Sequence, residues 1–570
     1  MQLVDARRLT GPNLQTRVPG AVTEVAFEPG DDPQACYARW QHHLQSICEH
    51  LPFSGGPTVA RFYEGGAAWV LPGAIDRLYA VILACEYAVA QTIAEQKGEA
   101  GPDLAETLDA IRAEYEEEQC ETLLAIEQEA QKQTVPFLWD DDFVSVGYGK
   151  DSITWTERQL PQPHDIPWNT LSSIPIVFIT GTNGKTTTSR LLARMVRCAG
   201  LAPGNSSTDG VFINEQLVEE GDWTGPGAAR TILRRKDVDV AVLEAARGGI
   251  LRRGLGVESC EAALVTNVAN DHLGDYGIHT VPQMAQAKGV VYDVVSPDGF
   301  CVFNGDDENT RQLGQTKPGN KIFFSVHGKT AFLEERQQMG DALLYIEQGN
   351  IIWDHEGEQQ LLCPIADCPL SMHGTALYNI SNILGAVGLG MALKLPKSAM
   401  LEALQSFGAS WHDNPGRGQL THINGVQILL DFGHNPHGVA AVLQMARDLL
   451  AQQNQGGRFS VSMGQAGDRN DTDLIELCES VAPLKPDRIY LRDMKEYLRG
   501  RPQGEVPQIM KSNLEKMNYP TSQIFHCETE IESLHHALKW AQQGDMVVHL
   551  VHTEREPIQQ FLKESGAQMS

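Results

Sequence analysis

The chain contains 570 residues, of which 42% are hydrophobic, so it is too long for one core and suggests roughly three or four domains. This ordinary apolar content excludes a disordered or fibrous protein. The net charge of −28 argues against nucleic-acid binding, because a phosphate backbone attracts a positive surface; it fits an enzyme that attracts a cationic substrate, although solubility alone is the simpler reason for such acidity.

Residues 1–170 are predicted to form an α+β N-terminal domain. The longest apolar stretch, residues 67–94, is interrupted by charged residues such as Asp76 and Glu86, which predicts a buried helix pair and not a membrane span. Loose helical spacing of leucine and isoleucine predicts a long acidic helical segment over residues 103–133.

The first residues lack the apolar core of a signal peptide, and the eleven cysteines include no CxxC pair. Scattered thiols without a leader indicate reduced cysteines. The expectation is therefore a cytoplasmic protein with no membrane partner.

Residues 171–412 alternate short β-branched runs with amphipathic helices, the pattern of a parallel α/β sheet. Each predicted strand ends at a polar group, and ligands bind beyond the carboxyl ends of such strands. One ligand site is therefore expected at the ends of Ile176–Thr180, Val238–Leu243, Ala262–Thr266 and Phe300–Phe303.

A second α/β pattern occupies residues 413–570 and predicts a Rossmann-like C-terminal domain. Its expected strands are Val426–Leu430, Phe459–Met463, Arg488–Leu491 and Met546–Val551.

The strongest chemical signal is the glycine loop Gly181-Thr-Asn-Gly-Lys185-Thr-Thr-Thr188, which a strand enters and a helix leaves. Glycines let the backbone wrap a phosphate, the helix N-terminus attracts its charge, and Lys185 reaches outer phosphates. The Thr186 hydroxyl is then placed to hold Mg²⁺. A glycine turn without a ligand is the alternative, and strand, lysine and threonine together argue against it.

The loop is shorter than the standard P-loop and resembles that of the Mur ligase superfamily, which includes peptidoglycan amino-acid ligases and folylpolyglutamate synthase. The resemblance implies a P-loop central domain that binds ATP and Mg²⁺. By this resemblance the phosphate contacts are Gly181, Thr182, Asn183, Gly184, Lys185, Thr186 and Thr187.

Further matches follow in the family's order. Glu244 and His272 resemble its magnesium-binding residues beside Thr186, and Lys288 stands where many members carry a carbamylated lysine. Arg417 takes the place of an arginine that contacts the terminal phosphate. Asn304, Asp431 and His434 belong to segments that meet adenine and ribose in the family. The implied catalytic set is Lys185, Glu244, His272, Lys288 and Arg417.

Longer motifs, such as residues 221–226 and 243–256, resemble the Mur-ligase half of cyanophycin synthetases, which couple arginine to aspartate side chains. Residues 1–170 faintly resemble the N-terminal domain of those synthetases, yet the several hundred residues of their ATP-grasp domain are absent. The family's Arg-His-Asn is replaced by Leu377-Tyr378-Asn379, and Asn205-Ser-Ser-Thr-Asp-Gly210 replaces Thr-Thr-Thr-Asp-Gly. These departures could shift the substrate.

Substrate contacts are the least specific prediction. Thr208 and Asp209 lie on the expected acceptor side, and Arg252 and Arg253 either bind an acidic acceptor or cap the surface. A cationic amino acid is expected near the C-terminal domain. The acidic candidates for it are Asp468, Asp493 and Glu505.

The sequence thus predicts an ATP- and Mg²⁺-dependent ligase that joins the carboxylate of a small acceptor, such as an aspartyl peptide, to an amino acid. Two alternatives stay open: a Mur-type ligase for an unrelated small acid, and a non-catalytic partner of a full synthetase. The intact phosphate-loop and metal residues argue against the second. A homo-oligomer is possible.

Overall fold

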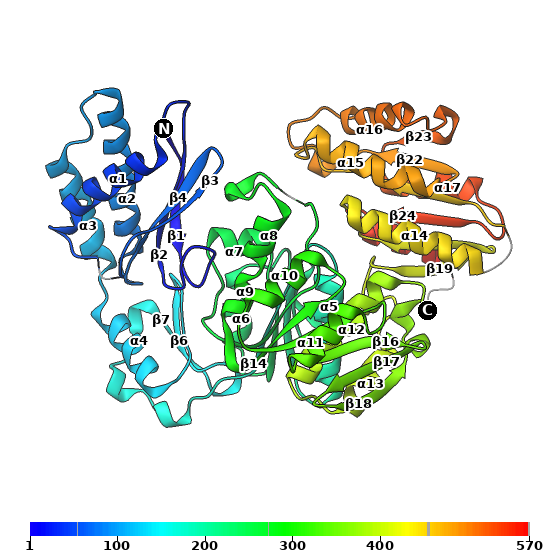
Figure 1. Ribbon diagram of the computed structural model, residues 1–570, viewed down its shortest axis with the longest axis horizontal. Helices are drawn as coiled ribbons and strands as arrows, with labels where there is room; N and C mark the ends of the chain where they lie inside the picture. The colour runs from blue at the N-terminus through cyan, green and yellow to red at the C-terminus, as the bar shows by residue number, and fades with distance from the viewer. Residues whose placement is uncertain (54, 272, 453–455, 568–570) are drawn as a thin grey trace.

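The computed structural model describes residues 1–53, 55–271, 273–452 and 456–567. The chain is α/β, and the N-terminal part, the central part and the C-terminal part follow one another across the molecule (Figure 1).

The N-terminal part begins with a four-stranded antiparallel sheet in the order β1-β2-β4-β3. Trp40 of α1 and Trp69 of β4 are fully buried between the sheet and its helices. The elements are β1 Gln2–Leu9, β2 Gly20–Ala26, α1 Pro33–Cys48, β3 Val59–Tyr63, β4 Gly66–Pro72, α2 Leu78–Lys97 and α3 Leu104–Glu118.

Two sequence predictions fail in this part. Residues 67–94 form strand β4 and one helix, α2, and not a helix pair. The predicted helical segment over 103–133 is two helices, α3 and α4 (Glu121–Gln133), because Gln119 is extended and the Cys120 amide donates to the buried Asp76 carboxylate (3.1 Å).

Among the described residues, α2 alone is long and apolar enough, by length and composition, to cross a membrane. Core helices meet the same criterion, and α2 packs on the N-terminal sheet through Ala80, Val81 and Ala84. A small antiparallel sheet follows, formed by β5 Phe137–Trp139, β6 Phe143–Val146 and β7 Ile153–Thr156.

The central part is built on an eleven-stranded sheet in the order β11-β10-β9-β12-β8-β13-β14-β15-β16-β17-β18. Its middle strands, β9 to β16 in this order, are parallel, and antiparallel hairpins extend both edges. Buried aliphatic side chains line both faces, as expected for a parallel sheet covered by helices. The predicted strand Ile176–Thr180 is β8 residue for residue.

The strands of the central part are β8 Ile176–Thr180, β9 Pro203–Ser207, β10 Gly210–Ile213, β11 Gln216–Glu220, β12 Val240–Glu244, β13 Cys260–Val265, β14 Val295–Asn304, β15 Asn320–Ser325, β16 Ala342–Glu347, β17 Asn350–His355 and β18 Glu358–Pro364. The helices are α5 Lys185–Cys198, α6 Pro226–Leu233, α7 Arg247–Arg252, α8 Val281–Lys288, α9 Val290–Asp293, α10 Glu308–Thr316, α11 Ala331–Gln338, α12 Leu377–Ala392 and α13 Lys397–Ser406.

The C-terminal part has a six-stranded sheet in the order β19-β20-β24-β21-β22-β23, parallel except for the β19–β20 hairpin. Its strands are β19 Gln419–Ile423, β20 Val426–Asp431, β21 Phe459–Met463, β22 Arg488–Arg492, β23 Ile524–Cys527 and β24 Met546–Leu550. Its helices are α14 Pro436–Gln452, α15 Asp471–Val481, α16 Glu505–Lys516, α17 Glu530–Trp540 and α18 Arg555–Glu564.

Candidate active site between the central and C-terminal parts

The glycine loop joins β8 to α5 and requires glycine at both ends. Gly181 (φ +148°) and Gly184 (φ +85°) have backbone angles that L side chains rarely adopt. A Cβ at Gly184 would lie 2.0 Å from Asn382 Oδ1, and one at Gly181 would lie 1.9 Å from Thr266 Oγ1. The loop therefore lies against its neighbours in one fixed shape and presents the N-terminus of α5.

Lys185 folds back over this loop. Its Nζ donates to the carbonyl oxygens of Gly181 and Thr182, at 3.2 Å each. Both acceptors are neutral, so a phosphate oxygen would be the stronger partner for this charge.

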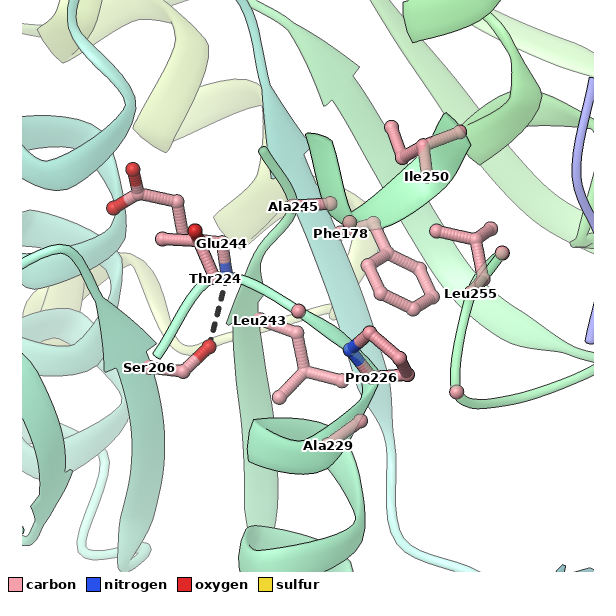
Figure 2. Close-up of a pocket in the computed structure, with 14 residues that line it drawn as sticks. Phe178, Ser206, Thr224, Pro226, Ala229, Leu243, Glu244, Ala245, Ile250 and Leu255 are labelled. Carbon is pink, nitrogen blue, oxygen red and sulfur yellow. Dashed lines mark hydrogen bonds between the residues drawn. The ribbon is translucent and has the colours of Figure 1, made fainter. Parts of the chain in front are cut away.

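Beside the loop, the Thr186 hydroxyl donates to Glu244 Oε2 at 2.9 Å. Glu244 ends β12 and is 2% exposed, its backbone N–H donates to Ser206 Oγ (3.2 Å), and its Oε1 has no hydrogen-bond partner (Figure 2). Burial raises the pKa of Glu244, an effect that Lys185 and Arg417 oppose. A buried carboxylate with an unsatisfied oxygen is costly unless a cation meets it.

The hollow shown in Figure 2 lies behind Glu244, between residues 224–226 and 249–256. Its volume is about 10 Å³, the room needed by one water molecule. The Glu244 carboxylate points away from the apolar wall of this hollow. Residues of the motif 243–256 therefore pack on the side of Glu244 opposite to its carboxylate.

The carboxylate oxygens of Glu244 and the hydroxyl oxygen of Thr186 are suitable ligands for Mg²⁺. Across the described ranges no group of three His, Cys, Asp or Glu side chains is placed to hold a metal on its own. Magnesium is usually bound by one or two carboxylates together with water and substrate phosphates, which matches Glu244 and Thr186 beside a phosphate loop. His272, the third predicted ligand, lies outside the described residues.

Lys288, at the end of α8, is 6% exposed and donates to the Gly181 carbonyl at 2.8 Å. Burial, reinforced by Lys185, lowers its pKa to about 7. A large neutral fraction at neutral pH is what attack on carbon dioxide requires, so the side chain suits the carbamylation that the family resemblance implied.

A cavity of about 370 Å³ extends from the phosphate loop into the space between the central and C-terminal parts. This interdomain cavity is of the size typical for small-molecule sites. Most predicted nucleotide-binding residues line it: Thr182, Asn183, Gly184, Lys185, Thr186, Thr187, Asn304, Arg417, Asp431 and His434. Its apolar lining includes Val326, Leu377, Ala441 and Val442.

Asp431 ends β20 and fixes the turn that carries Arg417. Its carboxylate accepts from the backbone of Gly418 (2.8 Å) and Gly433 (2.7 Å), and the Tyr378 hydroxyl lies 3.5 Å away. Burial raises the pKa of Asp431 to about 6. Tyr378, where the sequence departs from the family, thus faces this carboxylate.

His434 follows on the same segment. Its Nδ1 lies 3.3 Å from the Phe432 carbonyl oxygen, and its Nε2 lies 3.9 Å from Asp271. Burial lowers the pKa of His434 to about 4, so the ring is neutral and its Nε2 is suited to hydrogen bonding at neutral pH.

The glycine loop contacts the C-terminal part directly. Asn183 and Asn435 exchange two side-chain amide hydrogen bonds, of 3.2 and 2.9 Å. The sequence alone gave no reason to pair these asparagines, although Asn435 belongs to the segment that suggested nucleotide contact.

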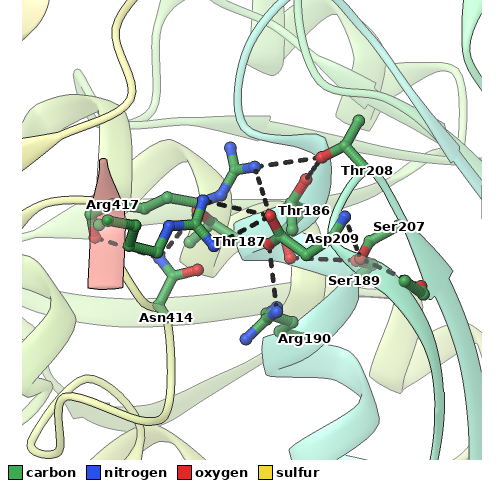
Figure 3. Close-up of polar contacts among 12 residues, drawn as sticks. Thr186, Thr187, Ser189, Arg190, Ser207, Thr208, Asp209, Asn414 and Arg417 are labelled. Carbon is green, nitrogen blue, oxygen red and sulfur yellow. Dashed lines mark hydrogen bonds and ion pairs between the residues drawn. The ribbon is translucent and has the colours of Figure 1, made fainter. Parts of the chain in front are cut away.

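The predicted substrate residues separate into three groups. Thr208 belongs to the phosphate site, since its Oγ1 lies 3.4 Å from Thr186 Oγ1 and accepts from Arg417 (3.1 Å) (Figure 3). Asp209 faces arginines: Arg190 at 3.1 Å, Arg555 at 3.2 Å and Arg417 at 3.6 Å.

Arg252 and Arg253 lie where the N-terminal part meets the central part. The backbone carbonyls of Arg252 and Arg253 accept from Arg7 (3.2 Å) and from the Thr10 amide (2.8 Å), and the Arg253 side chain reaches the Arg8 carbonyl (3.4 Å). These contacts connect both arginines to the N-terminal part.

The acidic residues of the C-terminal part have partners of their own. Asp468 pairs with Arg499, Asp493 with His526 (2.9 Å), and Glu505 with Arg501 (2.9 Å).

Sequence reasoning missed Arg190 and Arg555, because neither belongs to a recognisable motif. It also missed the apolar lining of the interdomain cavity, since these side chains are ordinary helix and strand residues until the fold brings them together.

Comparison with known proteins matches the domain models "Mur ligase middle domain" over residues 179–390 and "Mur ligase, glutamate ligase domain" over residues 416–550. The cyanophycin synthetase of Crocosphaera subtropica is 37% identical over 378 residues, which are 66% of this chain and 42% of the relative. That of Synechocystis is 36% identical over 387 residues. The chain thus spans about two fifths of the length of these relatives.

More distant similarity extends to UDP-N-acetylmuramoyl-L-alanyl-D-glutamate–2,6-diaminopimelate ligase of Listeria monocytogenes, 24% identical over 66% of this chain and 72% of that one. A structure of Yersinia pestis bifunctional folylpolyglutamate synthase/dihydrofolate synthase, complexed with AMPPNP and Mn ion, covers 66% of this chain and 85% of its own, with a TM-score of 0.48 and 19% identity. By its middle and C-terminal domains, the chain belongs to the Mur ligase family.

Proposed function

We propose that the chain joins a carboxylate to an amine at the expense of ATP. The observation that carries this proposal is the group formed by Thr186, Glu244, Thr208 and Arg417 at the phosphate-loop end of the interdomain cavity. A phosphate loop, an unsatisfied buried carboxylate oxygen and a guanidinium meet at one place, as phosphoryl transfer requires.

In the first step a carboxylate oxygen of the acceptor attacks the γ-phosphorus, the bond to ADP breaks, and an acyl phosphate forms. Negative charge grows on the transferred oxygens. Lys185 leaves its carbonyl partners to meet this charge, and Arg417 approaches from the C-terminal side. Glu244 and Thr186, with His272 as the further family ligand, would hold Mg²⁺, which when bound would neutralise part of the same charge.

In the second step the amine nitrogen attacks the acyl carbon, phosphate leaves, and the nitrogen loses a proton. Water also hydrolyses an acyl phosphate, so the cavity must exclude water. The contact between Asn183 and Asn435 favours this exclusion, because it brings the C-terminal part onto the phosphate loop.

The remaining nucleotide contacts follow from the same cavity. We assign the base and ribose to Asn304, Asp431 and His434, whose side chains line the cavity together with apolar residues. Residues 171–412 and 413–570 would then be the two domains that bind ATP. Residues 1–170 would form a further domain, to which we assign no ATP contact.

We further propose that Lys288 acts as its carbamate, which would turn a buried cation into an anion near the metal. Native intact-mass analysis at neutral pH, where a carbamate survives, tests this after incubation with bicarbonate, with Lys288→Arg as the control. The added mass of one carbon dioxide should appear in the chain with Lys288 and not in the Lys288→Arg variant. Its absence from both proteins would remove the carbamate from the mechanism.

The acceptor is proposed to be an aspartyl peptide of the cyanophycin type, and the amine an amino acid. Support comes from the 37% identity to a cyanophycin synthetase and from the motif around Glu244. An unrelated small acid is the competing acceptor.

The test is incubation with ATP, Mg²⁺, single amino acids and β-aspartyl acceptors, followed by ADP release and product mass. We expect ADP only when both substrates are present, and a product whose mass equals their sum less water. Thr186→Val should abolish this release and Thr186→Ser should restore part of it. Absence of acceptor-dependent ADP across a broad panel would rule the proposal out.

A further inference from the structure

Asp209 joins the central part of the molecule to the C-terminal part. It lies in the turn between β9 and β10, its side chain is 12% exposed, and it meets Arg190 of α5 (3.1 Å), Arg417 (3.6 Å) and Arg555 at the start of α18 (3.2 Å). Figure 3 shows its carboxylate between Arg190 and Arg417. Burial alone would raise the pKa of Asp209, but the guanidinium groups outweigh it and lower the pKa, so the carboxylate is charged.

Arg555 reaches Asp209 from a firmly held segment. The Glu530 carboxylate accepts the backbone N–H groups of residues 552–554, each at 3.0 Å from its nearer oxygen, and pairs with the fully buried Arg492 at 3.0 Å. Both Arg555 terminal nitrogens lie 3.2 Å from Asp209 Oδ1. The position of Arg555 is thus fixed by buried contacts of Glu530 and Arg492 within the C-terminal domain.

Asp209 is also connected to the phosphate site. Arg417, which it contacts, donates to Thr208 Oγ1 (3.1 Å), and that oxygen lies 3.4 Å from Thr186 Oγ1. Arg417 Nε is buried without a hydrogen-bond partner. The contacts run from α18, through Asp209 and Arg417, to the hydroxyl that would hold Mg²⁺.

We propose that Asp209 is a positioning residue that, with Arg555, latches the C-terminal domain onto the central domain and thereby aims Arg417 at the terminal phosphate. An ammonium substrate would have to displace three guanidinium groups to reach this carboxylate, so we assign Asp209 to the latch and not to substrate binding. Because the Arg555 side chain is 30% exposed, the pair can open for nucleotide exchange at moderate cost. The inference rests on the proposed ligation.

Arg555→Gln tests the latch, with Lys563→Gln as its control because Lys563 is an exposed cation on the same helix. Weakening the latch lowers the closed population, and saturating nucleotide restores it. We expect the KM for ATP to rise about ten-fold with kcat within two-fold of its original value. Arg555→Lys should recover part of the KM, and Lys563→Gln should change neither constant.

Asp209→Asn should raise the same KM and also lower kcat at least ten-fold, since Arg417 loses its anchor. A readout independent of catalysis is the radius of gyration from small-angle X-ray scattering. It should increase in nucleotide-free Arg555→Gln and return towards the original value with a non-hydrolysable ATP analogue.

The outcomes separate the two proposals. A chain that binds no ATP and forms no product removes the ligase proposal, while the scattering comparison still tests the latch. An active chain whose Arg555→Gln and Asp209→Asn variants keep the original KM, kcat and radius overturns the latch. So does an Asp209→Asn variant that changes only the KM of the amine or acceptor. If Asp209→Asn does not fold, the Arg555 series decides.

Discussion

Two charged regions of this molecule differ in whether their polar side-chain atoms have partners within the protein. The proposed phosphate site, formed by Thr186, Thr208, Glu244 and Arg417, leaves two buried atoms, Glu244 Oε1 and Arg417 Nε, without a hydrogen-bond partner. The acidic group of the C-terminal domain, formed by Asp468, Asp493 and Glu505, is paired throughout with Arg499, His526 and Arg501. Unpartnered buried atoms cost stability and are retained where a ligand completes them. The comparison therefore separates a site prepared for a ligand from charges that satisfy one another.

The largest effect should come from Glu244→Gln, which keeps the side-chain shape and removes the charge. Ligation should fall about 10²- to 10³-fold, the range for losing one group that stabilises charge in a transition state. Because burial disfavours the ionised carboxylate, the thermal midpoint should stay or rise. Glu528→Gln, at an exposed carboxylate outside the site, is the control. A strong fall in midpoint with activity intact would mean that Glu244 is structural.

A buried ion pair outside the site should show the reverse pattern. Glu530→Gln leaves Arg492 charged and fully buried, so the C-terminal domain should lose about 3 kcal/mol of unfolding free energy in urea. Arg492 also holds the pKa of Glu530 at about 2 against the opposing effect of burial. Glu528→Gln, which breaks the exposed pair with Lys495, should cause no measurable change. Equal losses in both variants would contradict the comparison.

Lys288 should make stability depend on pH. Its folded pKa of about 7 lies below the ordinary 10.5, so between these values the unfolded chain binds more protons than the folded one. Without bicarbonate, unfolding free energy should therefore rise with pH by about 1 kcal/mol per pH unit just above pH 7.5, and decline as pH falls towards 7. Lys288→Met should flatten this slope, and an unchanged slope would show that Lys288 is not its source.

The smallest effect is expected for Asp468→Asn. This carboxylate is 44% exposed and already paired with Arg499, so the KM of a cationic amine should change less than three-fold and the thermal midpoint should not move. A ten-fold rise in that KM, with the KM for ATP constant, would show that the acidic group opens to bind the amine.

Local sequence patterns predicted the structure correctly where the conformation of a short segment depends mainly on its own residues. Strands β8 and β21 match the sequence prediction residue for residue, because a short continuous or alternating apolar run between turns leaves few alternatives. The glycine loop was equally predictable from the sequence, since positive φ angles next to a helix start demand glycine. The helix break at Cys120 was not, because it depends on Asp76, a residue remote in sequence.

The sequence by itself thus determined a glycine loop, its lysine and threonine, two α/β parts and the polar strand ends that gather around the loop. Only the tertiary structure decided which charges are satisfied: that Asp209 faces Arg190, Arg417 and Arg555, that Asn183 pairs with Asn435, and that Asp468 and Glu505 meet arginines of their own domain. The physical reason is that a side chain's partner depends on where distant backbone is placed, whereas a loop or strand depends mainly on its own residues.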